Sequence, residues 1–230
     1  MVKDMTTGSP TRLILFFTLP LLVGNIFQQL YNMADTIIVG RTLGYKALAA
    51  VGGSSGSIMF LVFGFFFGLT CGLAVITAQR FGAHDEDGVR RSVAASLVMC
   101  AVITAAATLL CVLGARPVLE LMRTPEDIVD ETYNYLIVMF WGGWTIVFYG
   151  MLSSIIRALG DSRTPLYFLI ISSIVNVVLD FYFILSLKSG VAGAAWATVI
   201  AQGLSGFLCL IYMLRKFPIL RLRRRDWIFN

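Results

Sequence analysis

The chain has 230 residues, of which 58% are hydrophobic and 13% are charged, whereas a soluble domain is roughly 45 to 50% apolar and about 25% charged. Together with a mean hydropathy of +0.83, this composition excludes a soluble domain and most classes of soluble enzyme. The net charge of +5 does not predict a nucleic-acid partner, because the basic residues lie in short breaks between apolar runs and form no surface stripe.

Six apolar runs follow one another along the chain, and each is long enough to cross a bilayer. They cover approximately residues 13–39, 47–78, 93–113, 133–156, 165–187 and 191–214. Because a chain in lipid must satisfy its backbone hydrogen bonds internally, all six are predicted to be helices. The predicted fold class is an all-α polytopic membrane protein with six transmembrane helices in residues 1–216, followed by a basic cytoplasmic tail or linker over residues 217–230.

Lysine and arginine are distributed unequally between the two sides of these six crossings. One side holds 13 of the 18 basic residues, with Arg157 assigned to one of its breaks. The other side holds Arg41, Lys46, Arg116, Arg123 and Lys188. Because basic loops stay in the cytoplasm, both termini are predicted to be cytoplasmic. The expected setting is a multi-pass protein of the plasma (inner) membrane, in contact with lipid.

Neither the cysteines nor the single histidine forms a catalytic or metal-binding pattern. Cys71, Cys100, Cys111 and Cys209 lie inside apolar runs without metal-site spacing, so they are predicted to be small packing residues. His84 lies in an acidic loop with no nucleophile arrangement near it. An enzyme is therefore the least expected function, and no cofactor is predicted.

Glycine recurs every fourth residue in the second run, at Gly64, Gly68 and Gly72. Small residues at this spacing let two helix backbones approach closely in lipid. The second helix is therefore predicted to use this face for helix packing.

Two acids remain inside the apolar runs, Asp35 in the first and Asp180 in the fifth. An acid at the centre of a membrane helix costs about 2.5 to 3.5 kcal/mol on insertion scales, so both are candidates for function. Pro20 and Pro165 precede them by 15 residues each, about 22 Å of helix, which predicts similar depths in the membrane. The alternative is that each carboxylate lies close enough to the interface to stay hydrated.

Polar side chains accompany the acids at helical spacing, and such neighbours share one helix face. They are Asn25, Gln28 and Asn32 in the first run, Ser173 and Asn176 in the fifth, and Thr198, Gln202 and Ser205 in the sixth. These faces are predicted to turn inward and line a polar cavity, or alternatively to form interhelical hydrogen bonds alone.

No lysine or arginine lies within the runs to neutralise the two acids. Two adjacent carboxylates cannot both ionise at low cost, so the site is expected to hold a shared proton or a hard cation such as Na⁺. Asn176 and Thr198 offer neutral oxygens for the cation.

Five segments, in this order, resemble the multidrug and toxic compound extrusion (MATE) transporters, especially the bacterial branch. They are PLLVGNIFQQLYNMAD (residues 20–35), continuing to residue 50, then QRFGA (79–83), RALGD (157–161), NVVLD (176–180) and GAAWAT (193–198). The resemblance covers essentially the whole chain.

The resemblance implies an antiporter that exports organic, often cationic, compounds against inward flow of Na⁺ or H⁺. It implies a cation site at the positions matching Asp35, Asn176, Asp180 and Thr198, which would be the metal ligands if the ion is Na⁺. A tyrosine of the fourth span matches Tyr135. Protonation in that family is expected to bend the first helix near Pro20, where a helix bond is missing.

The chain departs from the family in length, since the family has twelve spans in two lobes. It is similar to the amino-terminal lobe, so we expect a fragment, whose partner is the missing second lobe, rather than an assembly of two chains. Two other functions stay open. A lipid-linked oligosaccharide flippase is expected to have a more cationic cavity, and a non-transporting scaffold or remnant would not need the two acids.

Overall fold

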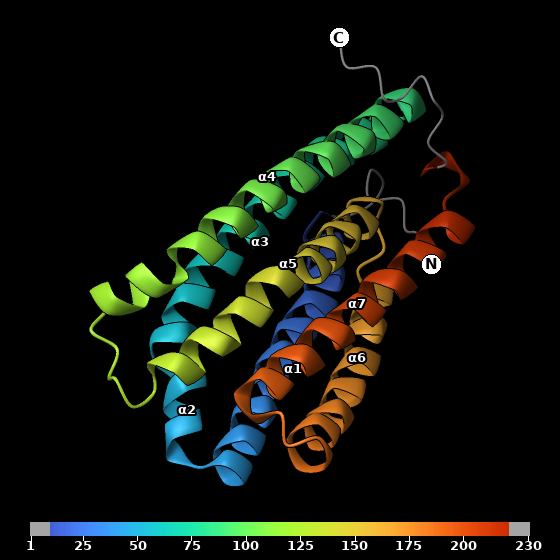
Figure 1. Cartoon of the computed structure of the whole chain (residues 1–230). Coiled ribbons are helices and arrows are strands. Elements are labelled where there is room, and N and C mark those ends of the chain that lie inside the picture. Colours follow the sequence, from blue (N-terminus) through green and yellow to red (C-terminus); the bar gives the residue numbers. More distant parts are fainter. Residues whose placement is uncertain (1–9, 221–230) are drawn as a thin grey trace.

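A computed structural model describes residues 10–220, and these residues form a bundle of long helices (Figure 1). The elements are α1 (Pro10–Leu43), α2 (Tyr45–Gly52), α3 (Ser54–Gly82), α4 (Glu86–Leu121), α5 (Val129–Ala158), α6 (Arg163–Phe181), the π-helical turn η1 (Tyr182–Ser186), α7 (Gly190–Lys216) and the 3₁₀ turn η2 (Pro218–Leu220). Six segments are long and apolar enough to cross a membrane. The predicted all-α class with six transmembrane helices is confirmed.

Helix boundaries extend beyond the predicted runs where polar caps prolong a helix past the apolar stretch. The third run was predicted to cover residues 93–113, whereas α4 begins at Glu86. Asp85 caps this helix, since its carboxylate accepts a hydrogen bond of 2.9 Å from the Gly88 amide, and acidic residues fill the first turn. Such capping satisfies free amide groups and favours negative charge at the helix start.

The second apolar run is divided between α2 and α3, a break that hydropathy does not reveal. Gly53 separates the two helices with φ −82° and ψ −115°. A Cβ atom at this position would lie 2.5 Å from the carbonyl oxygen of Ala49. Ser55 donates its hydroxyl to the carbonyls of Ala50 and Val51, so the backbone groups exposed by the break are bonded locally.

Helices α5 and α7 lie at the centre of the bundle and approach each other closely. A Cβ atom on Gly142 of α5 would lie 2.0 Å from the Val199 side chain of α7, and one on Gly206 would lie 2.8 Å from Phe148. The Thr145 hydroxyl also donates to the Val199 carbonyl at 3.1 Å. Half of the spanning window of each of these two helices is buried, against 6% for α1.

The glycine repeat of the second run does not make the predicted close contacts within the described part of the chain. Gly64, Gly68 and Gly72 are exposed, and a Cβ atom on any of them would meet nothing within 4 Å. The close helix contacts are instead made by glycines of α5 and α7. The expectation was wrong because the spacing of small residues does not tell which face of α3 meets a neighbour.

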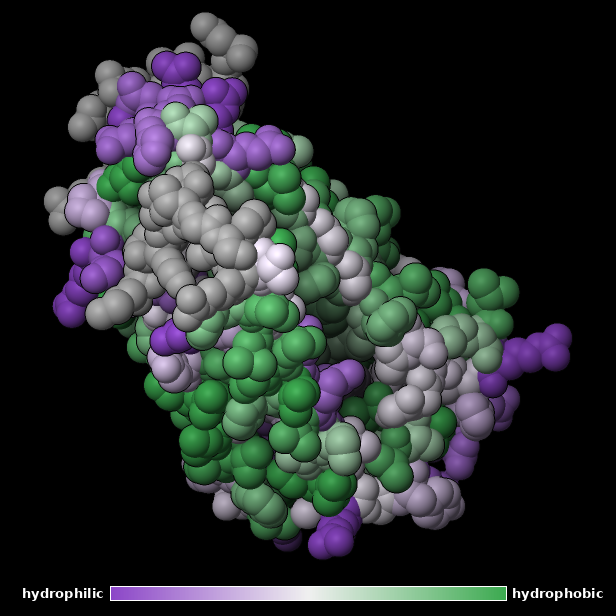
Figure 2. Space-filling view, turned by 180° about the vertical axis from the view of Figure 1, so that it is seen from behind, coloured by the Kyte–Doolittle hydropathy of each residue, from purple (hydrophilic) through white to green (hydrophobic). Residues whose placement is uncertain are grey.

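Hydrophilic side chains gather toward the ends of the molecule, while hydrophobic ones cover much of its length (Figure 2). The exposed apolar residues include Leu19, Leu22 and Ile26 of α1 and Leu109 and Leu110 of α4. This distribution suits a surface that meets lipid or another apolar partner. Of the basic segment predicted over residues 217–230, residues 221–230 lie outside the described part.

Candidate functional site

Asp35 of α1 and Asp180 of α6 come together inside the bundle. Asp180 is 0% exposed and Asp35 is 8% exposed, and the two side chains are in direct contact. Neither carboxyl forms an ion pair with a base among residues 10–220. The two acids on the parallel helices α1 and α6 thus lie at the same level in the bundle, as expected.

Asn176 and Thr198 connect the carboxyl pair to α7. The amide of Asn176 lies 3.5 Å from the hydroxyl oxygen of Thr198. In the orientation that satisfies both ends of the amide, its nitrogen donates to Asp180 Oδ2 at 3.1 Å and its oxygen accepts from the Thr198 amide at 3.2 Å. These three residues therefore form one connected polar cluster across α6 and α7.

Two tyrosines complete the cluster, one of them not anticipated from the sequence. Tyr135 of α5 is buried and lies beside Asp35 and Asp180. Tyr31 of α1 is also buried, and its hydroxyl lies next to Thr198. Tyr31 is four residues before Asp35 and three after Gln28, so the helical spacing that marked the polar stripe would have included it.

Several oxygens of this cluster have no hydrogen-bond partner in the described part of the chain. They are Asp35 Oδ1, Asp180 Oδ1, the Tyr31 hydroxyl and the side-chain oxygen of Gln202. Buried oxygens are normally bonded, because leaving one unpaired costs about 1 to 3 kcal/mol. Carboxylate, amide and hydroxyl oxygens are the donors that a hard cation prefers, so the residues present fit a proton or Na⁺.

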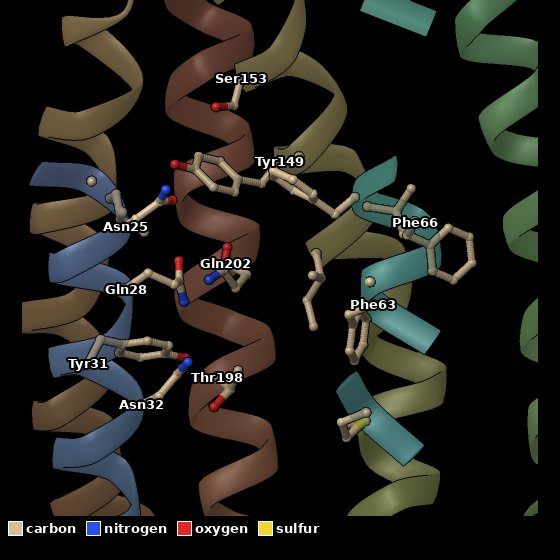
Figure 3. A pocket seen from close by; sticks show the side chains of 18 of the residues that line it. Asn25, Gln28, Tyr31, Asn32, Phe63, Phe66, Tyr149, Ser153, Thr198 and Gln202 are labelled. Carbon is tan, nitrogen blue, oxygen red and sulfur yellow. The ribbon is translucent and has the colours of Figure 1, made fainter. Parts of the chain in front are cut away.

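A cavity of about 670 Å³ begins at this cluster and extends toward Pro20. We call its two ends the Asp35 end and the Pro20 end. Side chains of α1, α3, α5 and α7 surround it (Figure 3). Its aromatic wall includes Phe60, Phe63 and Phe66, whereas amides of α1 and α7 lie on the polar wall. A hollow in the hydrophobic face is visible from outside (Figure 2).

Five of the eight polar residues on the faces predicted to line a cavity lie on its wall, namely Asn25, Gln28, Asn32, Thr198 and Gln202. Ser173 does not lie among the lining residues, and its hydroxyl donates to the Leu169 carbonyl at 2.8 Å. A serine in a helix can satisfy its hydroxyl on its own backbone, so its polar character did not require a cavity. Pro20 also lines the cavity, inside the continuous helix α1.

Arg157 also lines the cavity, at its Pro20 end. The sequence placed this residue in a cytoplasmic break, but α5 continues through it to Ala158. Among the described residues that line the cavity, Asp35 is the one acid and Arg157 the one base. Arg157 thus belongs to the last turn of α5 and not to a loop, because the apolar run ends before the helix does.

Comparisons with known proteins agree on one family. The family model described as MatE matches residues 20–182. The chain is 31% identical over 212 residues to the probable multidrug resistance protein YpnP of Bacillus subtilis. The aligned residues make up 92% of this chain and 47% of YpnP. YoeA of the same organism, also named a probable multidrug resistance protein, is 32% identical over 87% of this chain and 44% of its own length.

Solved structures give the same result for the fold. A crystal structure of a MATE protein in the bent conformation has a TM-score of 0.88 and 27% identity, covering 97% of this chain and 50% of the other. The chain thus spans about half the length of the relatives and solved proteins that it matches. The chain belongs to the MatE family of multidrug and toxic compound extrusion transporters and corresponds to one six-helix lobe of them.

Proposed function

We propose that this chain forms half of a cation-coupled antiporter that exports organic, often cationic, compounds in exchange for Na⁺ or H⁺. The observation that carries the proposal is the contact between Asp35 and Asp180, buried without a basic partner at one end of a polar cavity. A structural role alone gives no reason to keep two acids where each costs free energy.

The carboxyl pair is suited to hold one exchangeable positive charge. Two adjacent buried carboxylates repel each other, so a proton shared between them or a bound cation lowers the free energy of the pair. A Na⁺ ion would be held by Asp35, Asp180, Asn176 and Thr198, and would supply the charge that the pair lacks. The unpartnered oxygens of the cluster support either ion.

The ion cluster and the cavity share residues, which gives a physical basis for coupling. Asp35, Tyr31 and Thr198 belong to the cluster and also line the cavity. Charge on Asp35 attracts an organic cation, so an ion that neutralises this charge weakens cargo binding. Coupling of this kind is reciprocal, since the cargo must then weaken ion binding by the same factor.

Helix α1 is the element suited to move when the ion changes. It carries both Asp35 and Tyr31, and little of its spanning window is buried. Pro20 cannot donate a backbone hydrogen bond, which makes bending at this point less costly. We propose that ion uptake at Asp35 changes the bend of α1 and so the shape of the cavity.

The cavity wall suits flat, positively charged organic molecules. Aromatic faces such as those of Phe60 and Phe63 attract cations, and amides such as Gln28 and Gln202 offer adaptable hydrogen bonds. The names of the Bacillus subtilis relatives, probable multidrug resistance proteins, agree with a cargo of drug-like organic compounds.

We place the protein in the plasma (inner) membrane as a multi-pass protein, with lipid and an organic cargo as its partners and no nucleic acid. A second six-helix lobe, or a second chain, is proposed to cover the open side of the cavity. Alternating access by rocking of two halves needs such a counterpart.

Binding measurements on the chain in lipid nanodiscs test the proposal. Tetraphenylphosphonium is titrated while Na⁺ concentration and pH are varied separately. We expect its affinity to fall at least about fivefold as the coupling ion rises, in line with usual coupling energies. The ion that produces the fall is the coupling ion.

Asp35→Asn and Asp180→Asn should remove this ion dependence, because an amide carries no charge to neutralise. Asp127→Asn is the matched control, since Asp127 lies in a loop and pairs with Lys46 at 3.3 Å. Unchanged ion dependence in both Asp35→Asn and Asp180→Asn would refute the coupling role and favour a non-transporting scaffold.

A further inference from the structure

Arg157 brings a positive charge into the cavity at its Pro20 end. An arginine near the end of a membrane helix usually extends its charged group toward the lipid headgroups. Here the side chain lines the cavity, and one of its N–H groups donates to the Ser154 hydroxyl at 3.1 Å. A guanidinium has five N–H donors, so a single serine leaves most of them available.

No carboxylate of the described residues forms an ion pair with Arg157. The nearest acid along the chain, Asp161, is already engaged by other donors. It accepts from the Tyr212 hydroxyl at 2.6 Å and from the Thr164 hydroxyl at 2.7 Å. Asp35 lies at the other end of the cavity, 15 residues from Pro20 along α1, which is about 22 Å of helix.

Other hydrogen-bond donors line the same end of the cavity. The hydroxyl groups of Ser153 and Ser162 belong to its wall, and Ser153 lies at this end beyond Tyr149 (Figure 3). The first amides of α6, on Arg163 and Thr164, are bonded to Asp161 at 3.1 Å each. The helix start is thus occupied and the Ser153 hydroxyl contacts Tyr149, so the free donors are the guanidinium and the Ser162 hydroxyl.

We propose that the Pro20 end of the cavity binds a carboxylate or phosphate group through Arg157, assisted by Ser162. A guanidinium matches the geometry of such groups and forms strong charge-assisted hydrogen bonds with them. The inference rests on the proposed function, because it takes the cavity to be the cargo site. It places the anionic group of a cargo that carries both charges at this end of the cavity.

A pair of dyes that differ in one charge tests the site. One is a cationic rhodamine with a free carboxylate, and the other is the methyl ester of the same dye. Their affinities for the chain in phosphatidylcholine nanodiscs are measured by fluorescence anisotropy. We expect Arg157→Gln to weaken the free-acid dye about tenfold or more and to leave the ester within about twofold.

Arg163→Gln is the matched control, because Arg163 is exposed and lies outside the cavity wall. It should change neither dye. Equal weakening of both dyes by Arg157→Gln, or no weakening of either, overturns the anion site while the cargo site stands. Binding of the free acid without the ester overturns the proposed cation-binding function while the anion site stands. If neither dye binds, both proposals are wrong.

A second arm distinguishes a cargo carboxylate from a lipid phosphate as the occupant. Phosphatidylglycerol is added to the nanodiscs at a fixed total amount of lipid. If a lipid headgroup occupies the site, the added phosphatidylglycerol should weaken binding of the free-acid dye to the wild-type chain but not to Arg157→Gln. If affinity is unchanged in the wild-type chain, the site is open to cargo.

Discussion

Asn176 is the residue that holds the carboxyl pair against α7. Its amide bonds Asp180 on one side and the Thr198 backbone on the other, and it is fully buried. Asn176→Ala should therefore lower the free energy of unfolding by about 1 to 3 kcal/mol, because it leaves buried polar groups unpaired. Thermal unfolding of the chain in detergent measures the loss. The dependence of tetraphenylphosphonium affinity on the coupling ion should become weaker in the same variant.

Ser173→Ala provides the control for Asn176→Ala on the same helix. The Ser173 hydroxyl bonds the carbonyl of its own helix, so its removal leaves no buried group without a partner. We expect a change within about 0.5 kcal/mol. A loss in Ser173→Ala as large as that in Asn176→Ala would show that α6 is sensitive to any substitution, and would remove the special role of the amide.

Sequence reasoning at this scale found the two buried acids and missed Tyr31 and the position of Arg157. Asp35 and Asp180 stand out because acids are rare in apolar runs. Tyr31 was overlooked because tyrosine is common in membrane helices, although its spacing fits the polar stripe. Arg157 was assigned to a loop because hydropathy falls before α5 ends. Proximity of Asn176 to Asp180 followed from spacing, since helical neighbours share a face, whereas the grouping with Thr198 of α7 was implied by the family resemblance.

Close packing of α5 against α7 depends on Gly142, where any side chain would collide with Val199. Gly142→Ala should destabilise the chain by about 1 to 3 kcal/mol, the usual cost of overpacking. Gly68→Ala is the control, since an added Cβ there meets nothing within 4 Å. Thermal unfolding should show a loss in the first variant and none in the second. The reverse order would mean that α3 uses its glycine face for packing after all.

The turn between α5 and α6 is held by Asp161, which Gly160 with φ +87° positions. Burial alone would raise the pKa of Asp161, but hydrogen bonds from Tyr212, Thr164 and Arg163 outweigh it and hold the pKa below its ordinary value. An acid with a depressed pKa stabilises the folded state above its unfolded pKa, here about 3.9. The stabilisation is lost as the pH falls through the lower pKa that Asp161 has in the folded state.

Asp161→Asn should consequently lower stability by roughly 1 to 3 kcal/mol at pH 7, with the loss of charge-assisted hydrogen bonds. The difference from the wild-type chain should begin to shrink below about pH 4, where the carboxyl of the unfolded chain takes up a proton, and should be lost only below the lower pKa of the folded state. Thermal unfolding at several pH values measures both effects. A difference that stays constant down to about pH 3 would assign the loss to packing rather than to the carboxylate charge.

The number of membrane helices was predictable because each crossing needs an uninterrupted apolar run. The division of the second run at Gly53 was not predictable, because glycine in an apolar segment does not show whether the helix breaks. The π-helical turn Tyr182–Ser186 after Asp180 was likewise invisible to hydropathy. Such irregularities come from local backbone contacts, and composition averages over them.

The distribution of basic residues predicts the orientation of the whole molecule, and the orientation decides which side of the membrane meets each end of the cavity. The basic residues predict that the α3–α4 turn lies in the cytoplasm and the α4–α5 loop outside. The Pro20 end, which contains Arg157, should then lie toward the cytoplasm, while the Asp35 end lies toward the outside. Cargo from the cytoplasm would meet the arginine before the carboxyl pair.

Cysteine labelling of intact cells tests this orientation. Glu86 in the first turn of α4 and Glu126 in the α4–α5 loop are both exposed, so each accepts a cysteine at little cost. In a background with the four native cysteines replaced by serine or alanine, an impermeant maleimide should label Glu126→Cys in intact cells. It should label Glu86→Cys only after the membrane is opened. Labelling of Glu86→Cys alone in intact cells would reverse the orientation, and with it the order in which an outgoing molecule meets Arg157 and Asp35.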